Sequence, residues 1–423
     1  MTQISGANGR MTQTAADVVL EASAKGMADP ELFEDLMRVT ASLSDAPLYL
    51  DNQVDLLIDG PATYNAMLTA IAAAKSRIYL ETYIFADDKV GRKFARQLMQ
   101  KAREGLHVRL IYDSFGSLKS DDDFFAKMRD SGIEIVEFHD INPLSGGNPL
   151  NINVRDHRKL LIVDSEVAFT GGINLSSTYS SSSSSRKNQD LLNDGWRDTH
   201  VAIRGPAVAG FEALFRSNWL KHGGASFELV SAAESQVSAG GDIVAVLGSV
   251  GGDDEGSAIF HAYMDAIEKA RKSIWITQAY FAPDENFLDT LVAAAARGVD
   301  VRIIVPGVSD SKLVLNASRS RYEKLLAANI RIYERNASLL HAKTAVIDGV
   351  WSTVGSSNLD YRSSLHNDEV NAVIFGTAFG RQLEQQFRED LRESQPIELN
   401  EWRARGFVDR LLEWASWPLE YWL

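Results

Sequence analysis

The chain has 423 residues, a formal net charge of -14, a hydrophobic content of 45% and no cysteine. This length exceeds one ordinary hydrophobic core, so at least two domains are expected. The lack of cysteine excludes disulfides and thiolate zinc sites, and the acidic balance disfavours nucleic acid as a partner, because duplex binding needs positive surface.

The amino-terminal region, residues 1–50, is expected to form a helical extension, with helical patterning between Ala15 and Met37 and no motif that carries chemistry. Residues 1–10 lack the apolar core of a secretory signal. No apolar stretch approaches the roughly 20 residues that a membrane-spanning helix needs. Contact with a membrane is therefore expected to be peripheral.

An internal duplication organises the rest of the chain. Residues 70–80 combine apolar positions at helical spacing with a short β-branched and aromatic run, which predicts a helix followed by a strand. Residues 105–111 begin with a helix-capping glycine and continue as a second strand. The same two patterns recur at 266–276 and 298–304. This repetition predicts an α/β fold of two similar halves, each a sheet with helices on both faces.

A short motif is the most informative part of each half. It reads His-x-Lys, four residues, then Asp, and a glycine turn ending in Asn follows it. A strand at this point would place the histidine and the lysine on the same face. The copies are offset by 184 residues and comprise His157, Lys159, Asp164 and Asn174 in the first half, and His341, Lys343, Asp348 and Asn358 in the second.

Two histidines, two lysines and two asparagines suit phosphodiester chemistry. One histidine can act as nucleophile while the other acts as acid and later as base. The lysines supply positive charge, and the asparagines supply hydrogen-bond donors that do not titrate. No metal or other cofactor is expected, because the nearby carboxylates lack the clustering of a divalent metal site.

Acidic residues recur after each motif and are candidates for orienting the histidines. Asp198 and Glu369 occupy matching places in the aligned segments 198–205 and 369–376. Each acid can hold the histidine of its own half or that of the other half, and both pairings are compatible with the sequence. Asp164 and Asp348 are expected mainly to brace the turns after their strands.

The expected divisions are a first repeated domain at 51–222, a linker at 223–241, a second repeated domain at 242–400 and an aromatic carboxyl-terminal segment at 401–423. The serine run from Ser180 to Ser185 is read as a loop at the site mouth or as an inert insertion. Arg155 and Arg158 are read as lipid-phosphate ligands or as exposed side chains.

These motifs resemble those of the phospholipase D superfamily, and the chain is similar to bacterial cardiolipin synthases. Further resemblance lies in residues 80–85, 277–283, 318–322 and 354–363. The resemblance implies two phospholipase D-like domains related by a pseudo-twofold axis, with one shared active site and a covalent phosphatidyl-histidine. It favours His157 as the nucleophile and His341 as the acid, although the symmetry of the motifs permits the reverse.

The resemblance also implies a function. The expected reaction moves a phosphatidyl group from a phospholipid, phosphatidylglycerol or phosphatidylethanolamine, to the free hydroxyl of phosphatidylglycerol. The alternatives are hydrolysis to phosphatidic acid, a superfamily nuclease and a non-catalytic lipid-binding protein. The expected location is the bacterial cytoplasm, with peripheral association at the inner membrane. Phe407, Leu411 and Trp414 would share one helical face, either at a bilayer interface or packed on the second domain.

Overall fold

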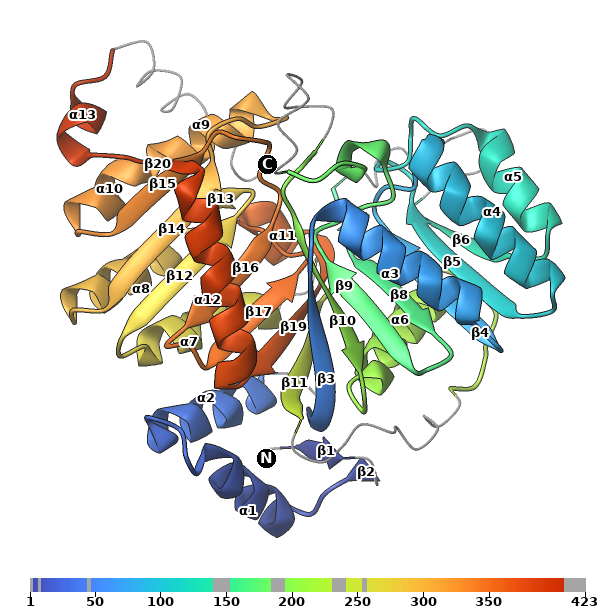
Figure 1. The fold of residues 1–423 in the computed structure, drawn as a ribbon, viewed down its shortest axis with the longest axis horizontal. Coiled ribbons are helices and arrows are strands. Elements are labelled where there is room, and N and C mark those ends of the chain that lie inside the picture. The colour runs from blue at the N-terminus through green and yellow to red at the C-terminus, as the bar shows by residue number, and fades with distance from the viewer. Residues whose placement is uncertain are drawn as a thin grey trace.

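In the computed structural model, the first half is one mixed sheet with helices on both faces (Figure 1). The structure describes residues 3–6, 9–43, 47–139, 153–183, 195–229, 241–252 and 257–406. The elements of the first half are β3 (Leu48–Ile58), α3 (Asp59–Ala73), β4 (Arg77–Thr82), α4 (Lys89–Arg103), β5 (His107–Asp113), α5 (Asp122–Asp130), β6 (Glu134–Phe138), β7 (Arg155–Asp156), β8 (Lys159–Val163), β9 (Val167–Gly171), the 3-10 turn η2 (Ser177–Tyr179), β10 (Thr199–Arg204) and α6 (Val208–Lys221).

The second half repeats this order of elements, with additions. Its elements are β11 (Asp242–Ser249), α7 (Ala258–Lys269), β12 (Ser273–Gln278), β13 (Phe281–Ala282), α8 (Glu285–Ala296), β14 (Asp300–Pro306), α9 (Lys312–Ser320), α10 (Tyr322–Ala327), β15 (Arg331–Arg335), β16 (Lys343–Ile347), β17 (Trp351–Gly355), β18 (Leu359–Asp360), α11 (Tyr361–Leu365), β19 (Asn367–Phe375), α12 (Thr377–Arg392), β20 (Ser394–Pro396) and α13 (Leu399–Arg403).

The two halves form one continuous sheet. In the first half the strands lie in the order β6-β5-β4-β8-β9-β10-β3, with β4, β5 and β6 parallel and the others antiparallel to their neighbours. The second half has the corresponding order β15-β14-β12-β16-β17-β19-β11. Strands β3 and β11 pair antiparallel and join the halves. The predicted α/β fold with helices on both faces is therefore confirmed.

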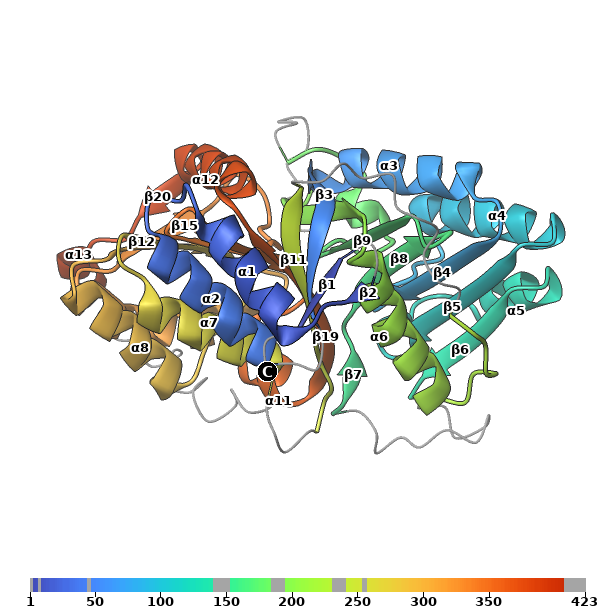
Figure 2. The same ribbon diagram turned by 90° about the horizontal axis from the view of Figure 1, so that it is seen from below.

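The helices cover the sheet as the duplication predicts. Helices α3, α4 and α5 pack on one face of the first half, and α7, α8 and α10 pack on the equivalent face of the second. The single helices α6 and α12 cover the opposite faces and share a central apolar cluster (Figure 2). Viewed as in Figure 2, a half turn about the centre exchanges α3 with α7 and α6 with α12, which is the expected pseudo-twofold relation.

The amino-terminal extension packs on the second half. It contains the expected helices, α1 (Gln13–Ala24) and α2 (Pro30–Ser42), and two short strands, β1 (Ile4–Gly6) and β2 (Gly9–Arg10). Apolar side chains of both helices join the core of the second half, where Phe33 meets Phe375 edge to face at 6.2 Å. Strand β1 pairs with β3. No helix within the described ranges is long and apolar enough to cross a membrane.

Candidate active site

Each His-x-Lys motif lies at the start of a buried central strand. All five residues of β8 and of β16 are buried, which explains why the segments after the lysines are apolar. Lys159 Nζ donates to the carbonyl oxygen of His157 at 2.5 Å, and Lys343 makes the same bond to His341. The two halves therefore hold their lysines against their histidines in the same way.

The acids pair across the halves. Glu369 Oε1 lies 2.9 Å from Nδ1 of His157, and Asp198 Oδ2 lies 2.8 Å from Nδ1 of His341. Of the two pairings compatible with the sequence, the structure has the crossed one. A carboxylate at Nδ1 fixes the proton on that nitrogen and leaves Nε2 to act on a substrate.

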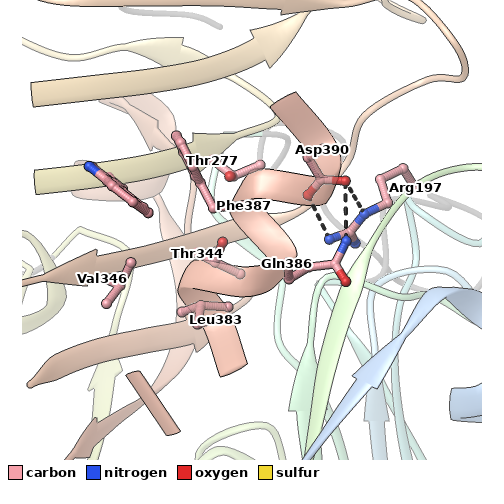
Figure 3. A pocket seen from close by; sticks show the side chains of 9 residues that line it. Arg197, Thr277, Thr344, Val346, Leu383, Gln386, Phe387 and Asp390 are labelled. Carbon is pink, nitrogen blue, oxygen red and sulfur yellow. Dashed lines mark hydrogen bonds and ion pairs between the residues drawn. The ribbon is translucent and has the colours of Figure 1, made fainter. Parts of the chain in front are cut away.

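Backbone hydrogen bonds repeat the same crossing. The His157 N–H donates to the Asp368 carbonyl at 2.9 Å, and the His341 N–H donates to the Arg197 carbonyl at 2.8 Å. Arg197 is itself anchored to the second half, because its Nε and Nη2 each lie 2.8 Å from the carboxylate of Asp390 on α12 (Figure 3). The pocket drawn there is lined by none of the candidate catalytic residues. Each histidine is thus positioned by backbone from the opposite half.

All six motif side chains are buried and close enough to perturb one another. Burial lowers the pKa of His157 well below its ordinary value, and the positive charges of Lys159 and Lys343 act in the same direction. Burial also lowers the pKa of Lys159 to about 7 and that of Lys343 to about 8. His157 therefore lies close enough to Lys343 of the other half for the lysine charge to act on it.

The two acids differ in their electrostatics. Burial raises the pKa of Glu369 to about 7, against the charge of Lys159 and two hydroxyl donors, Ser356 Oγ at 2.5 Å and Ser363 Oγ at 2.8 Å. Burial would also raise the pKa of Asp198, but the charge and hydrogen bond of His341 bring it below its ordinary value. Asp198 is therefore the more firmly ionised partner.

The asparagines stand on equivalent loops after β9 and β17. Asn174 Oδ1 accepts from Ile84 N at 3.2 Å, whereas Asn358 Oδ1 is buried without a hydrogen-bond partner among the described residues. Asp164 and Asp348 lie away from this chemistry. Each has a left-handed backbone, with φ of 55° and 53°, and accepts from three consecutive backbone N–H groups at 2.7–2.9 Å. Each carboxylate thereby ties the turn after its own strand to the helix–strand junction at 75–77 or 271–273.

Three aromatic residues and two serines at the site were missed by the sequence reasoning. Tyr179 Oη lies 3.2 Å from Nδ1 of His341 and 3.3 Å from Asn174 Nδ2. Its counterpart at the same 184-residue offset is Ser363, which contacts Glu369. Extending that offset past the asparagines would have identified this pair. The ring of Tyr83 is edge-on to His157 at 5.1 Å, and the ring of Tyr280 stands in a corresponding position beside His341 at 6.3 Å.

The interpretation of Arg155 and Arg158 as exposed side chains was wrong, because they are 1% and 2% exposed. Their interpretation as lipid-phosphate ligands stays a prediction. Arg155 lies 3.6 Å from Asp113, and Arg158 lies 3.6 Å from Glu81. A charged side chain is stable at such depth only beside a countercharge. No local sequence pattern indicates that these acids lie opposite the arginines.

Several expectations concern residues outside the described ranges. These are most of the linker at 230–240, the later serines at 184–185 and the carboxyl-terminal segment from 407 onward. Of the earlier serines, Ser182 and Ser183 contact the carboxylate of Asp59. In the described part of the chain, no group of three or more histidine, aspartate or glutamate side chains is arranged to hold a metal ion.

Comparison with known proteins agrees with this architecture. The family described as cardiolipin synthase, PLD-like domain, matches residues 67–192 and 263–391, one segment in each half. A cardiolipin synthase of Geobacillus sp. (strain WCH70) is 34% identical over 90% of this chain and 74% of that protein. Cardiolipin synthase 2 of Bacillus anthracis is 34% identical over 90% of this chain and 72% of that protein.

Solved structures share the fold at low identity. A phosphatidylserine synthase from Haemophilus influenzae Rd KW20 superposes with a TM-score of 0.66 at 14% identity, over 92% of this chain and 100% of that chain. A polyphosphate kinase from Porphyromonas gingivalis superposes with a TM-score of 0.55 at 14% identity, over 86% of this chain and 53% of that chain. The doubled motif, the crossed site and the matched sequences lead to one conclusion: the chain belongs to the family of cardiolipin synthases with phospholipase D-like domains.

Proposed function

We propose that this protein is a phosphatidyltransferase that makes cardiolipin from phosphatidylglycerol and a second phospholipid through a phosphohistidine. The observation that carries the proposal is the pairing of His157 with Glu369 and of His341 with Asp198, which puts two oriented imidazoles in one site. The relatives named cardiolipin synthase support the choice of substrate class.

In the first step, Nε2 of His157 attacks the phosphorus of the donor lipid, and the bond from phosphorus to the head-group oxygen breaks. His341, as imidazolium, gives its proton to that oxygen, and the head group leaves as the free alcohol. Burial and the charge of Lys343 lower the pKa of His341 as well, but the ionised Asp198 opposes that shift by stabilising the imidazolium, which supports the acid role for this histidine. Burial lowers the pKa of His157, which keeps it neutral and nucleophilic.

In the second step, the neutral His341 takes the proton from the free hydroxyl of phosphatidylglycerol. That oxygen attacks phosphorus, the bond to Nε2 of His157 breaks, and cardiolipin leaves. The non-bridging oxygens are held in both steps by Lys159 and Lys343, with Asn174 and Asn358 as neutral donors. The reaction needs no metal ion, because these four side chains supply the charge and the hydrogen bonds.

Hydrolysis would use the same intermediate with water as the acceptor. The two reactions differ in product, so the test is a lipid analysis of purified protein incubated with phosphatidylglycerol vesicles. We expect cardiolipin and free glycerol, with an undiminished rate in the presence of a metal chelator. Phosphatidic acid as the sole phospholipid product would replace the transferase by a hydrolase. Because the substrates reside in bilayers, we place the protein at the inner-membrane surface of a bacterial cell.

A further inference from the structure

Three of the seven large apolar side chains that are exposed in the described part of the chain lie on two equivalent segments of the halves: Leu118 is 65% exposed, Phe115 44% and Leu313 36%. The other four are Val18, Leu229, Val250 and Leu365. Leu118 and Phe115 follow β5, and Leu313 lies at the start of α9, after β14. We call residues 114–121 and 307–313 the rim segments. Single exposed apolar side chains are common on soluble proteins, but three of them on two segments that adjoin the site from both halves favour a partner surface.

The first rim segment forms part of the wall of the site. Gly116 packs so closely on Tyr83 that an added Cβ would lie 2.8 Å from its ring. The ring of Tyr83 in turn lies 5.1 Å from that of His157. The segment that carries the exposed Phe115 and Leu118 therefore packs, through Gly116, on the aromatic side chain that adjoins a catalytic imidazole.

The second rim segment has the same relation to the other histidine. Tyr280 donates its hydroxyl to Asp310 Oδ1 at 2.8 Å. The ring of Tyr280 stands perpendicular to that of His341, with centroids 6.3 Å apart. Leu313 follows Asp310 by three residues. The rim segments thus flank one site from both halves.

The arrangement of the helices agrees with this placement. Helices α5 and α9, which begin at the ends of the rim segments, lie toward one end of the molecule, and α1 lies at the opposite end (Figure 1). Helix α1 carries Val18, an apolar side chain that is 62% exposed and therefore a matched reference. The pseudo-twofold axis relates the rim segments, so a flat surface can meet both at once.

We propose that the rim segments dock the protein on a phospholipid bilayer by inserting Phe115, Leu118 and Leu313 into its interface. The proposal rests on the proposed function, because a diacyl substrate must bring its phosphorus to imidazoles that are only 8% and 6% exposed. If the entrance of the active site contacts the bilayer, the acyl chains of the substrate stay in an apolar medium while its head group enters the site.

Apolar insertion, rather than charge attraction, drives this docking. Each segment has an exposed lysine beside its leucine, Lys119 and Lys312, whose stem can lie along the lipid while the ammonium stays in water. Four exposed acidic side chains, Asp310 and the aspartates at 121–123, outnumber the two lysines. Charge attraction to an anionic bilayer is therefore not the driving force, and added salt is expected not to weaken binding to vesicles.

The test compares Leu118→Asp/Leu313→Asp with Val18→Asp in the full chain. The probe is sedimentation of sucrose-loaded vesicles of equal parts phosphatidylglycerol and phosphatidylcholine. We expect the rim double variant to bind at least about tenfold more weakly and Val18→Asp to bind like the unmodified protein. Asp is favourable at the start of α9, so Leu313→Asp preserves that helix, and an unchanged thermal unfolding midpoint verifies the fold.

Turnover separates docking from chemistry. The rim variant should lose activity on vesicles in proportion to binding, but keep its activity on short-chain phosphatidylglycerol below its micelle concentration. Unchanged vesicle binding by the rim variant, or an equal loss in Val18→Asp, would overturn the docking surface. Release of phosphatidic acid instead of cardiolipin would refute the proposed function alone, because vesicle binding is measured without reference to product.

Discussion

Glu369 holds Nδ1 of His157 at 2.9 Å although the two residues belong to different halves of the chain. In the reciprocal pair, Asp198 Oδ2 of the first half lies 2.8 Å from Nδ1 of His341 in the second half. Neither half therefore contains a complete histidine–acid pair. The two motifs therefore form one shared site, because the imidazole of each half is oriented by an acid of the other half.

The first prediction distinguishes the nucleophile role of one histidine from the acid role of the other. It uses a phosphatidyl donor whose leaving group departs without acid catalysis. A phosphatidyl ester of p-nitrophenol has a good leaving group, so His341→Ala should still release one p-nitrophenol per enzyme and then stop. His157→Ala should release none, and both variants should lose at least about 10³-fold in turnover on phosphatidylglycerol. Stopped-flow absorbance measures the burst. A burst in His157→Ala and none in His341→Ala would reverse the roles.

The second prediction tests the crossed acids with isosteric amides. Glu369→Gln should slow the p-nitrophenol burst, because the amide no longer fixes the tautomer of His157. Asp198→Asn should leave the burst rate unchanged. It should slow the later turnover, because His341 acts as the base in that step. We expect losses of about 10²–10⁴-fold in the affected step. If Asp198→Asn slowed the burst and Glu369→Gln did not, the crossed assignment of function would fail.

The third prediction concerns Tyr179. Its hydroxyl contacts both His341 and Asn174, so Tyr179→Phe should lower turnover about tenfold, the magnitude of one lost hydrogen bond. The matched control is Tyr322→Phe, which removes another buried hydroxyl, 3.4 Å from Glu334. Steady-state assays of both variants decide the matter. Equal losses would mean that Tyr179 acts through stability and not through His341.

The fourth prediction is a pH profile with an alkaline limb. The lysines hold the phosphoryl oxygens only when charged, and their pKa values of about 7 and about 8 imply that kcat/KM falls as pH rises through this range. At low pH the rate falls as His157 becomes protonated, below its ordinary pKa because burial lowers that value.

A guanidinium stays charged throughout this range, so Lys159→Arg should move the alkaline limb of kcat/KM upward even if the rate is lower. Lys119→Arg on the rim is the control and should leave the limb in place. An alkaline limb that stays unchanged in Lys159→Arg would assign it to another group.

Local patterns indicated the residues of the candidate site. The His-x-Lys spacing places each histidine two residues before a lysine that begins a strand, and its repetition with Asn174 and Asn358 indicates two equivalent halves. Such spacing is readable because backbone geometry along a strand depends only on neighbouring residues. The buried ion pairs of Arg155 and Arg158 were not readable, because their partners Asp113 and Glu81 are remote in sequence.

The sequence by itself determined the duplicated α/β fold, which follows from periodicity, and the phosphodiester-type residues, which follow from the repeated motif. It also carried the family resemblance, through the residues of that motif and its flanks. Only the tertiary structure decided that Glu369 serves His157 and Asp198 serves His341, and that Tyr179 adjoins His341. Those contacts depend on how two sheets join at β3 and β11, and a repeat cannot specify this because identical halves offer both pairings equally.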